Sequence, residues 1–555
     1  MIHKHQYGVI RTLRAAFIEE LTLIFLRWSF NLLVLFACIT LVACGGDSAQ
    51  SAKQAPLLEQ DNEWQAGIFK AQSRYKDQCA TPRSGIDPFS EQLYPDRSGT
   101  TMDEKMWLRS WSNDTYLWYD EISDRDPLSY SVLEYFDLLK TDFRTDSGSF
   151  KDNFHFSQAS DKYQTRTQSG RVSGYGISWQ FNQSFVPRNL QVRYTEPQSP
   201  AAIAGVQRGD LLVKVNDIDF INSSEQASVD SINAALFPDS ETQSVSFTLR
   251  NLQGTERTVQ LTSNNITLTP VQNVKVIDTP TARLGYLQFN SHIRSAQEPL
   301  IGAVQYFVDE NVTQLAVDLR YNGGGLLAIA SQLAYMVAGG AQTSGLIFDE
   351  LQFNGKNLNT NAVTGQALTP TPFYNRKIDY QNGIFTSQDL PSLNLTRIYV
   401  LTSEATCSAS EAFINGLRGV DVEVVMIGDN TCGKPYGFYP QDNCGTTYFT
   451  IQFQGSNHKG FGDYSGGFIP TPSPFFAADV LGCPVADDFS HSLGDTKEAM
   501  LAAAINYMQD ATCPAAPAAK FVATVLSEPG ISIQKPNTVL DAIMLENALY
   551  TPIRE

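Results

Sequence analysis

Basic residues are scarce in this 555-residue sequence, which has 40 lysines and arginines against 58 acidic residues and a net charge of −18. The acidic residues are spread along the chain, and no basic stripe is present that could follow a phosphate backbone. These features argue against nucleic acid as a partner. No Cys-x-x-Cys pair occurs either, so we expect no zinc or other metal site, and no motif calls for a cofactor.

Histidine is also rare, with six residues in the whole chain. A hydrolase with a Ser/His pair would need His292, His458 or His491 as its base, and none of them has a companion motif. A cysteine nucleophile is a further alternative, but no cysteine is accompanied by a motif that carries a base.

The first 43 residues have the features of an export signal, because basic residues precede an apolar run that ends in Leu41-Val-Ala-Cys44. This segment resembles a bacterial lipoprotein signal, which implies that Cys44 is lipidated and anchors the chain to a membrane of the cell envelope, facing the periplasm. By analogy with lipoprotein sorting, Gly45 favours the outer membrane. The alternative is a transmembrane anchor over 21–42, which Arg27 interrupts.

Six cysteines follow the signal, and an even number in an exported chain predicts disulfide bonds. The sequence alone does not choose among the pairings. Cys432 and Cys444 would close a short loop, and a bridge from Cys407 would brace the turn before Ser408. The six are Cys79, Cys407, Cys432, Cys444, Cys483 and Cys513.

The length suggests about three domains, and 42% hydrophobic residues can bury a sizeable core. Residues 44–100 are polar and predict a tether that leads into partly ordered chain. Residues 101–160 carry aromatic side chains at helical spacing, so we expect a helical N-terminal domain, the alternative being a sugar-binding aromatic platform. The tail 513–555 has no assigned role.

Residues 165–268 resemble a PDZ domain. The resemblance lies in Gly174-Tyr-Gly-Ile-Ser-Trp179 and in the run from Ser199 to Asp210, which continues into Leu211-Leu-Val-Lys-Val-Asn216. It implies that backbone N–H groups of Gly174, Tyr175, Gly176 and Ile177 bind the carboxylate of a peptide that adds to the sheet edge. The alternative is that this domain is only a spacer or gate.

From Thr281 onwards, predicted strands and helices alternate, which is typical of a parallel sheet. A predicted strand over 314–319 leads into Asp318-Leu-Arg-Tyr-Asn-Gly-Gly-Gly325 and then an apolar helix. A second strand, 398–401, is followed by a small polar turn and a helix that begins near Ser408 and closes at Gly419. A phosphate-binding loop would need Lys-Ser/Thr after the glycines, and this pair is absent.

Ser408-Ala-Ser-Glu411, the glycine turn and Lys434 one strand later resemble the C-terminal processing peptidases, also called tail-specific proteases, which are Ser/Lys enzymes. The resemblance implies that Ser408 is the nucleophile and Lys434 the base, since a lysine can act as base when burial lowers its pKa. Ser410 is the lesser candidate. The oxyanion hole is expected from the backbone N–H groups of Gly323, Gly324 and Ala409.

The implied architecture is a multidomain α/β protein: an N-terminal helical region, a PDZ-like β domain, and a crotonase/Clp-like α/β peptidase core over 269–512. Residues 348–395 are long and polar, and we expect an insertion at the rim, either a lid or an Ω-type loop. The implied function is an envelope-tethered serine endopeptidase that cleaves proteins or peptides engaged by their free C-termini. The oligomeric state is left open.

Two residues depart from the family pattern, in which glycine follows the lysine and a glutamine four residues beyond it orients the amine. Pro435 and Phe438 occupy these positions. Gln441, Gln452 or Tyr436 are the candidate replacements. The alternative function is a catalytically impaired scaffold that binds peptides through its PDZ domain.

Overall fold

The computed structural model describes residues 64–145, 148, 150–238 and 241–514. The predicted signal segment and Cys44 lie outside these residues, as does most of the predicted C-terminal tail. Among the described residues, no helix has both the length and the apolar character that a membrane span requires.

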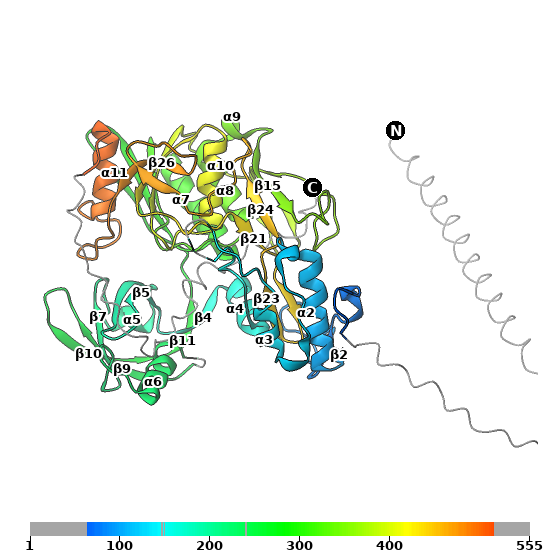
Figure 1. Cartoon of the computed structure of the whole chain (residues 1–555). Coiled ribbons are helices and arrows are strands. Elements are labelled where there is room, and N and C mark those ends of the chain that lie inside the picture. Colours follow the sequence, from blue (N-terminus) through cyan, green and yellow to red (C-terminus); the bar gives the residue numbers. More distant parts are fainter. Residues whose placement is uncertain (1–63, 146–147, 149, 239–240, 515–555) are drawn as a thin grey trace, which may run out of the picture. The chain divides into compact units, whose positions relative to one another are not determined.

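A seven-stranded sheet forms the core, in the order β12-β13-β14-β19-β20-β26-β25. Figure 1 labels one of its strands, β26, beside helix α11. All neighbours pair in parallel except β12, which runs antiparallel at one edge. Because parallel strands end at the same side of a sheet, the turns after β14 and β19 meet there. The strands are β12 (Val271–Asp278), β13 (Arg283–Phe289), β14 (Gln314–Asp318), β19 (Arg397–Thr402), β20 (Glu423–Gly428), β25 (Ile469–Thr471) and β26 (Asp479–Pro484).

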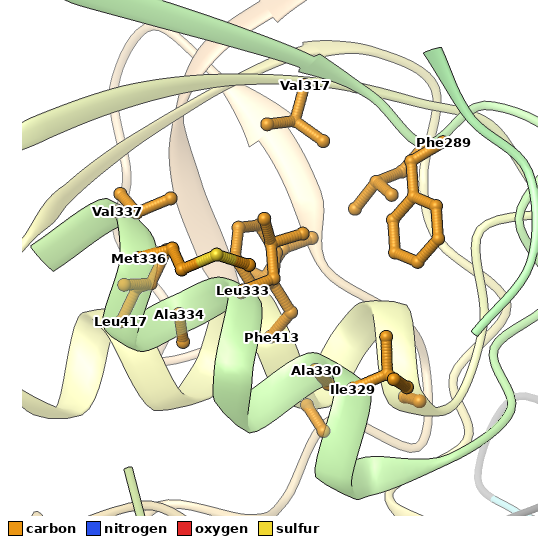
Figure 2. Packing of buried hydrophobic residues seen from close by; sticks show 14 of the residues in the cluster. Phe289, Val317, Ile329, Ala330, Leu333, Ala334, Met336, Val337, Phe413 and Leu417 are labelled. Atoms are coloured by element: carbon orange, nitrogen blue, oxygen red, sulfur yellow. The ribbon is translucent and has the colours of Figure 1, made fainter. Parts of the chain in front are cut away.

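Helices cover both faces of this sheet, as the strands' continuous burial requires. One face packs against α7 (Gln297–Asp309), α8 (Leu327–Ala338) and α10 (Ala409–Gly419). Figure 2 shows part of this core, where Leu333 of α8 and Phe413 of α10 meet below Val317 of β14. The opposite face packs against α11 (Ala499–Asp510). The predicted alternation of strands and helices is therefore present.

The predicted helical N-terminal region is only partly helical. Helix α2 (Thr101–Thr115) is capped by Thr100 and Asp103, and its Trp107 and Trp111 rings stack with centroids 5.2 Å apart inside the core. These rings are buried, so they do not form an open sugar-binding platform. The other elements are α3 (Val132–Asp137), β3 (Phe156–Ala159) and α4 (Ser160–Ser169).

Residues 64–100 pack more closely than a tether would. The strands β1 (Gln78–Cys79) and β2 (Arg97–Ser98) pair, and Tyr75 is fully buried in the same aromatic core as Trp107. A disulfide joins Cys79 to Cys444, which fixes this segment to the C-terminal α/β region. The polar composition concealed this anchoring because the contacts that supply it join positions far apart in the sequence: a buried aromatic ring, a disulfide, and hydrogen bonds such as the one from the Asp77 amide to Asn443.

The PDZ-like region is a sheet in the order β10-β9-β7-β6-β5, with β8 paired to β7. Helix α6 and the short α5 close a hydrophobic core that contains Tyr175, Trp179 and Phe247. The strand β5 lies at the edge of this sheet. The elements are β5 (Ile177–Gln183), β6 (Asn189–Thr195), α5 (Pro200–Ile203), β7 (Leu211–Val215), β8 (Ile218–Asp219), α6 (Gln226–Leu236), β9 (Ser244–Arg250) and β10 (Glu256–Thr262), flanked by the paired strands β4 (Arg171–Gly174) and β11 (Asn264–Thr267).

The segment 348–395 was expected to be a lid or loop, and this expectation is wrong for its first part. Strand β15 (Ile347–Phe353) pairs with both β16 (Thr371–Pro372) and β24 (Phe453–Ser456). Its apolar side chains Phe348, Leu351 and Phe353 are buried, a sparse pattern within a polar stretch. Strands β17 (Arg376–Asp379) and β18 (Ile384–Asp389) then form a hairpin.

Two smaller sheets surround the segment that follows Lys434. Strand β21 (Tyr436–Gly437) pairs with β24, and β22 (Gln441–Asn443) pairs with β23 (Thr446–Phe449). β23 in turn pairs with β3 of the N-terminal region. The N-terminal region is thus built into the C-terminal α/β region next to the loop that carries Lys434.

Candidate active site

Ser408 occupies the turn between β19 and α10, with φ of 59° and ψ of −115°. Residues other than glycine rarely adopt such a positive φ, and a strained serine between a strand and a helix is typical of a nucleophile elbow. Ser408 is 3% exposed. Ser410 is fully buried, and its hydroxyl donates to the Asn322 carbonyl at 2.9 Å, so it holds the turn together.

The glycine turn after β14 packs directly against this elbow. A Cβ added to Gly324, whose φ is +103°, would lie 2.8 Å from the Cys407 carbonyl and 2.9 Å from the Ala409 nitrogen. The structure thus brings the predicted oxyanion residues together. The Gly324 amide donates to the Asn322 side chain at 2.9 Å, so Gly323 is the better of the two glycine candidates to pair with Ala409.

Asn322 is the centre of this turn. Its amide group donates to the Phe289 carbonyl at 2.9 Å, and its carbonyl accepts the Cys407 amide at 3.1 Å. Its side-chain oxygen also lies 3.0 Å from Nδ1 of His292. These contacts fix the glycine turn to the end of β13 and to the serine elbow at once.

A buried carboxylate joins the serine elbow to the lysine loop. The backbone amides of Ser408 and Lys434 both donate to Oε2 of Glu411, at 2.9 and 2.8 Å. Oε1 accepts the Gly433 amide at 2.9 Å and the Thr431 hydroxyl at 2.6 Å. Burial raises the pKa of Glu411, and these hydrogen bonds oppose that rise. The four donors keep the two segments side by side.

A disulfide between Cys407 and Cys432 makes the same connection covalently. The brace considered at Cys407 is therefore present, whereas the short loop considered between Cys432 and Cys444 is not, because each of these cysteines has a different partner. The two sulfurs lie near Glu411 in a cluster of metal-ligand types within the described residues. Their bond to each other leaves no thiolate for an ion.

Lys434 is 1% exposed and lies in an aromatic pocket. Its Nζ is 4.2 Å from the centroid of the Phe438 ring and 5.1 Å from that of Phe154. Burial lowers the pKa of Lys434 to about 7, against the opposing charges of Asp152 and Glu411. A large share of the amine is therefore neutral near pH 7.

The candidates for the missing glutamine differ in their contacts. Gln441 donates to the carbonyl of Pro440, its neighbour in sequence, at 3.1 Å. Gln452 is buried and accepts the Tyr439 amide at 2.7 Å. Tyr436 is hydrogen-bonded to Ser465 and packs edge-on against Trp118. The ring of Phe438 stands at the family's glutamine position and contacts the amine directly.

The three histidines considered as bases, His292, His458 and His491, differ in burial and in hydrogen-bond partners. His292 is fully buried, accepts Leu326 N–H at its carbonyl at 2.8 Å, and burial lowers its pKa to about 4. Its Nδ1 contact with Asn322 supports the glycine turn. His458 lies 3.4 Å from the Ile347 amide, and His491 contacts Asp488 at 2.7 Å on the surface.

The predicted peptide-binding loop lies between β4 and β5. The Tyr175 carbonyl accepts the Ala201 amide, and the Gly176 carbonyl accepts the Glu196 amide at 2.8 Å. The Tyr175 ring is buried against Phe247. These contacts anchor the loop beside the edge strand β5, where Ile177 begins.

An ionic network connects this domain to the glycine turn. Arg208 donates to Asp487 and to the Tyr321 hydroxyl, both at 2.6 Å. Arg320 donates to the same Asp487 at 2.7 Å and to Glu498 at 2.8 Å. Since Arg320 and Tyr321 directly precede Asn322, the network reaches the base of the candidate oxyanion hole.

Three groups in the site were not predicted from the sequence: Glu411 in its bridging role, Asp152 and Phe154. Glu411 stands three residues after Ser408, the spacing of a capping box, and that signal could have identified its contact with the Ser408 amide. Asp152 and Phe154 belong to no motif, and their place near Lys434 depends on how the N-terminal region folds.

Comparisons with known proteins agree with this geometry. The model of peptidase family S41 matches residues 283–438, which include the glycine turn, Ser408 and Lys434. A carboxyl-terminal-processing protease of Picosynechococcus sp. is 26% identical over 267 residues, covering 48% of this chain and 55% of that protein. The chloroplastic carboxyl-terminal-processing peptidase 3 of Arabidopsis thaliana is 25% identical over 276 residues, covering 48% of this chain and 46% of that protein.

The chain thus spans about half the length of these curated relatives. Among solved structures, a putative S41 protease from Bacteroides fragilis has a TM-score of 0.54 at 23% identity, over 76% of this chain and 98% of that one, and supports the fold. Residues 283–438 therefore match the model of peptidase family S41, a family of serine-type peptidases, and this segment holds both Ser408 and Lys434.

Proposed function

We propose that this chain is a serine endopeptidase that works with a Ser408/Lys434 dyad. The observation that carries the proposal is the strained Ser408 elbow, tied through Glu411 to a fully buried lysine. Burial lowers the pKa of Lys434 to about 7, so a neutral amine is available to accept a proton. A hydroxyl becomes a competent nucleophile only when a base takes that proton.

In the proposed reaction, Lys434 Nζ takes the Ser408 proton as Oγ attacks the scissile carbonyl. The amides of Gly323 and Ala409 stabilise the oxyanion, and the protonated lysine then gives its proton to the leaving amine. Water hydrolyses the acyl-enzyme with Lys434 again as base. Asn322 holds the glycine turn in place throughout.

Labelling with a serine-reactive phosphonate tests this proposal. Wild type should be labelled at Ser408, and both Ser408→Ala and Lys434→Ala should lose the label. Ser410→Ala is the control, since its hydroxyl only donates to Asn322. Equal labelling of Ser408→Ala would end the serine-peptidase assignment. An unlabelled wild type that still binds peptides would favour the scaffold alternative, which the Phe438 departure supports.

We also propose that the PDZ-like domain recruits substrates by a free, apolar C-terminus. The edge position of β5 and the anchored loop at Gly174–Ile177 support this role. Amidating a peptide's C-terminus should weaken its binding, because the charge-assisted hydrogen bonds to the carboxylate are lost. Equal affinities in titration calorimetry would leave the domain as a spacer.

We further propose a lipid anchor on Cys44 that holds the chain in the bacterial envelope, facing the periplasm and favouring the outer membrane. The support is the sequence Leu41-Val-Ala-Cys44 after an apolar run. Cys44→Ser should release the protein from membranes, since a lipid chain contributes roughly 0.8 kcal/mol per buried CH₂. Continued sedimentation of the variant after signal cleavage would contradict the anchor.

A further inference from the structure

His292 lies in the segment between β13 and α7, and its backbone is bound to the glycine turn. Its N–H donates to the Gly324 carbonyl at 3.0 Å, and its carbonyl accepts the Leu326 N–H at 2.8 Å. The two segments run parallel here, with His292 opposite Gly325. The imidazole ring is fully buried and packs against Phe289, with ring centroids 4.4 Å apart. The side chain is therefore held in one place beside the turn that carries the candidate oxyanion donors.

The proton on this imidazole has a fixed position. The side-chain nitrogen of Asn322 donates to the Phe289 carbonyl at 2.9 Å, and its side-chain oxygen accepts the Gly324 N–H at 2.9 Å. Two backbone groups thus determine which end of the Asn322 amide is the oxygen. That oxygen lies 3.0 Å from Nδ1 of His292. Because an amide oxygen only accepts hydrogen bonds, Nδ1 must carry the hydrogen.

The other ring nitrogen, Nε2, is buried and has no hydrogen-bond partner among the described residues. A neutral imidazole has one N–H, and the contact with Asn322 uses it. A second proton would sit on a buried nitrogen without an acceptor, which agrees with the lowering of the pKa of His292 to about 4 by burial. His292 therefore stays neutral near pH 7 and serves Asn322 as a permanent donor.

The turn needs such support because its three consecutive glycines, 323–325, impose little conformation of their own. Gly324 and Gly325 have φ of +103° and +135°. The Gly323 N–H donates to no group in the part of the chain that the structure describes, so it is available to an oxyanion. Its direction depends on its neighbours Asn322 and Gly324, and both are hydrogen-bonded to His292.

We propose that His292 is a positioning residue of the oxyanion hole. By holding Asn322 and Gly324, it keeps the N–H of Gly323 directed at the oxygen of the reacting carbonyl. The inference rests on the proposed Ser/Lys function and deepens it. The contribution of this histidine is a fixed hydrogen-bond donor, not the removal of the Ser408 proton.

A matched pair of variants tests this inference in the full chain. The side-chain nitrogen of asparagine can occupy the place of Nδ1, whereas that of glutamine reaches the place of Nε2. His292→Asn therefore keeps a donor to Asn322, and His292→Gln loses it. The probe is an alkyl fluorophosphonate, whose P–O oxygen must enter the oxyanion hole as Ser408 Oγ attacks phosphorus and fluoride leaves. The readouts are the inactivation rate at saturation, the half-saturating concentration and the fraction labelled at completion.

His292→Gln should lower the saturated rate about 10²-fold, the loss expected when a catalytic group is misplaced by about an ångström. The half-saturating concentration should not change, and labelling should still reach completion. His292→Asn should recover most of the lost rate. Equal losses in both variants would overturn the inference. So would a wild-type saturated rate in His292→Gln, including one at a reduced labelled fraction, which would assign the histidine to folding alone.

If His292→Gln does not fold, the wild-type imidazole decides. Nitrogen NMR of the chain labelled at histidine should show a neutral ring with its proton on Nδ1 near pH 7, the signal being identified by its loss in His292→Asn. A proton on Nε2, or a charged ring, would overturn the inference while leaving the Ser/Lys dyad intact. A wild type that is not labelled at Ser408 would overturn the proposed function and this inference with it.

Discussion

Ser408 and Lys434 have surroundings that come from different parts of the chain. The serine elbow is enclosed by the Asn322 turn and α10, all within the segment that matches family S41. The lysine pocket takes Phe154 and Asp152 from the N-terminal region. The position of Ser408 is set by backbone geometry at the edge of a parallel sheet. The environment of Lys434 is set by side chains that are distant in sequence.

This difference has a chemical meaning. Backbone geometry fixes where the hydroxyl and the oxyanion donors lie, which decides how fast the reaction runs at best. Pocket polarity fixes the pKa of the base, which decides the pH at which the reaction runs. Variants on the two sides should therefore change different features of the pH–rate profile.

The largest effect is expected at the lysine itself. Wild-type single-turnover rates should rise with pH through about 7, because the pKa of Lys434 lies there and the neutral amine is the active form. Lys434→Arg should lower the plateau about 10³-fold, since guanidinium stays protonated. Retention of more than a few per cent of wild-type activity would mean that lysine is not the base.

Gly324→Ala should come next and should affect only the nucleophile side. The new Cβ would lie 2.8 Å from the Cys407 carbonyl, so the oxyanion turn must move. We expect the plateau of the pH–rate profile to be about 10²-fold lower. The pH at the midpoint of its rising part should not change. A shift of that midpoint pH would show that the serine side and the lysine side of the site do not act independently.

Phe154→Ala is the converse variant on the lysine side. Removing this wall admits water to the amine, and because burial is the main cause of the low pKa of Lys434, that pKa should rise. The midpoint of the rising part of the pH–rate profile should move up by about one pH unit. The plateau rate should change less. Measuring Gly324→Ala and Phe154→Ala in one buffer series compares the two sides of the site directly. An unchanged midpoint pH for Phe154→Ala would refute the role of the aromatic pocket in lowering the pKa of Lys434.

The smallest effect on activity is expected from the disulfide that joins the two halves. Cys407→Ser/Cys432→Ser and Cys483→Ser/Cys513→Ser remove bridges with similar separations of 25 and 30 residues. Each should cost roughly 3–4 kcal/mol of unfolding free energy. Only the first pair should also lower activity, by about tenfold, because it alone adjoins Ser408. Equal activity losses would assign both effects to stability.

Most of the α/β core could be predicted from the sequence. Apolar runs of strand length, a helix after each and glycine at the turns identified β14 and β19 with α8 and α10. Strand β15 was missed because its buried residues alternate within a polar stretch. The partner of Cys432 could not be chosen from the sequence because a disulfide depends on which loops meet in space.

The sequence by itself determined which residues could carry the chemistry: a serine before a helix, a glycine turn after a neighbouring strand and a lysine in the next loop. These signals are local, since each depends on a few adjacent residues and on the common edge of a parallel sheet. Only the tertiary structure decided the environment of the base. Burial of Lys434 depends on rings from Phe154 and Phe438, and its acidic neighbour Asp152 lies 282 positions earlier in the chain, too far for any local pattern to connect them.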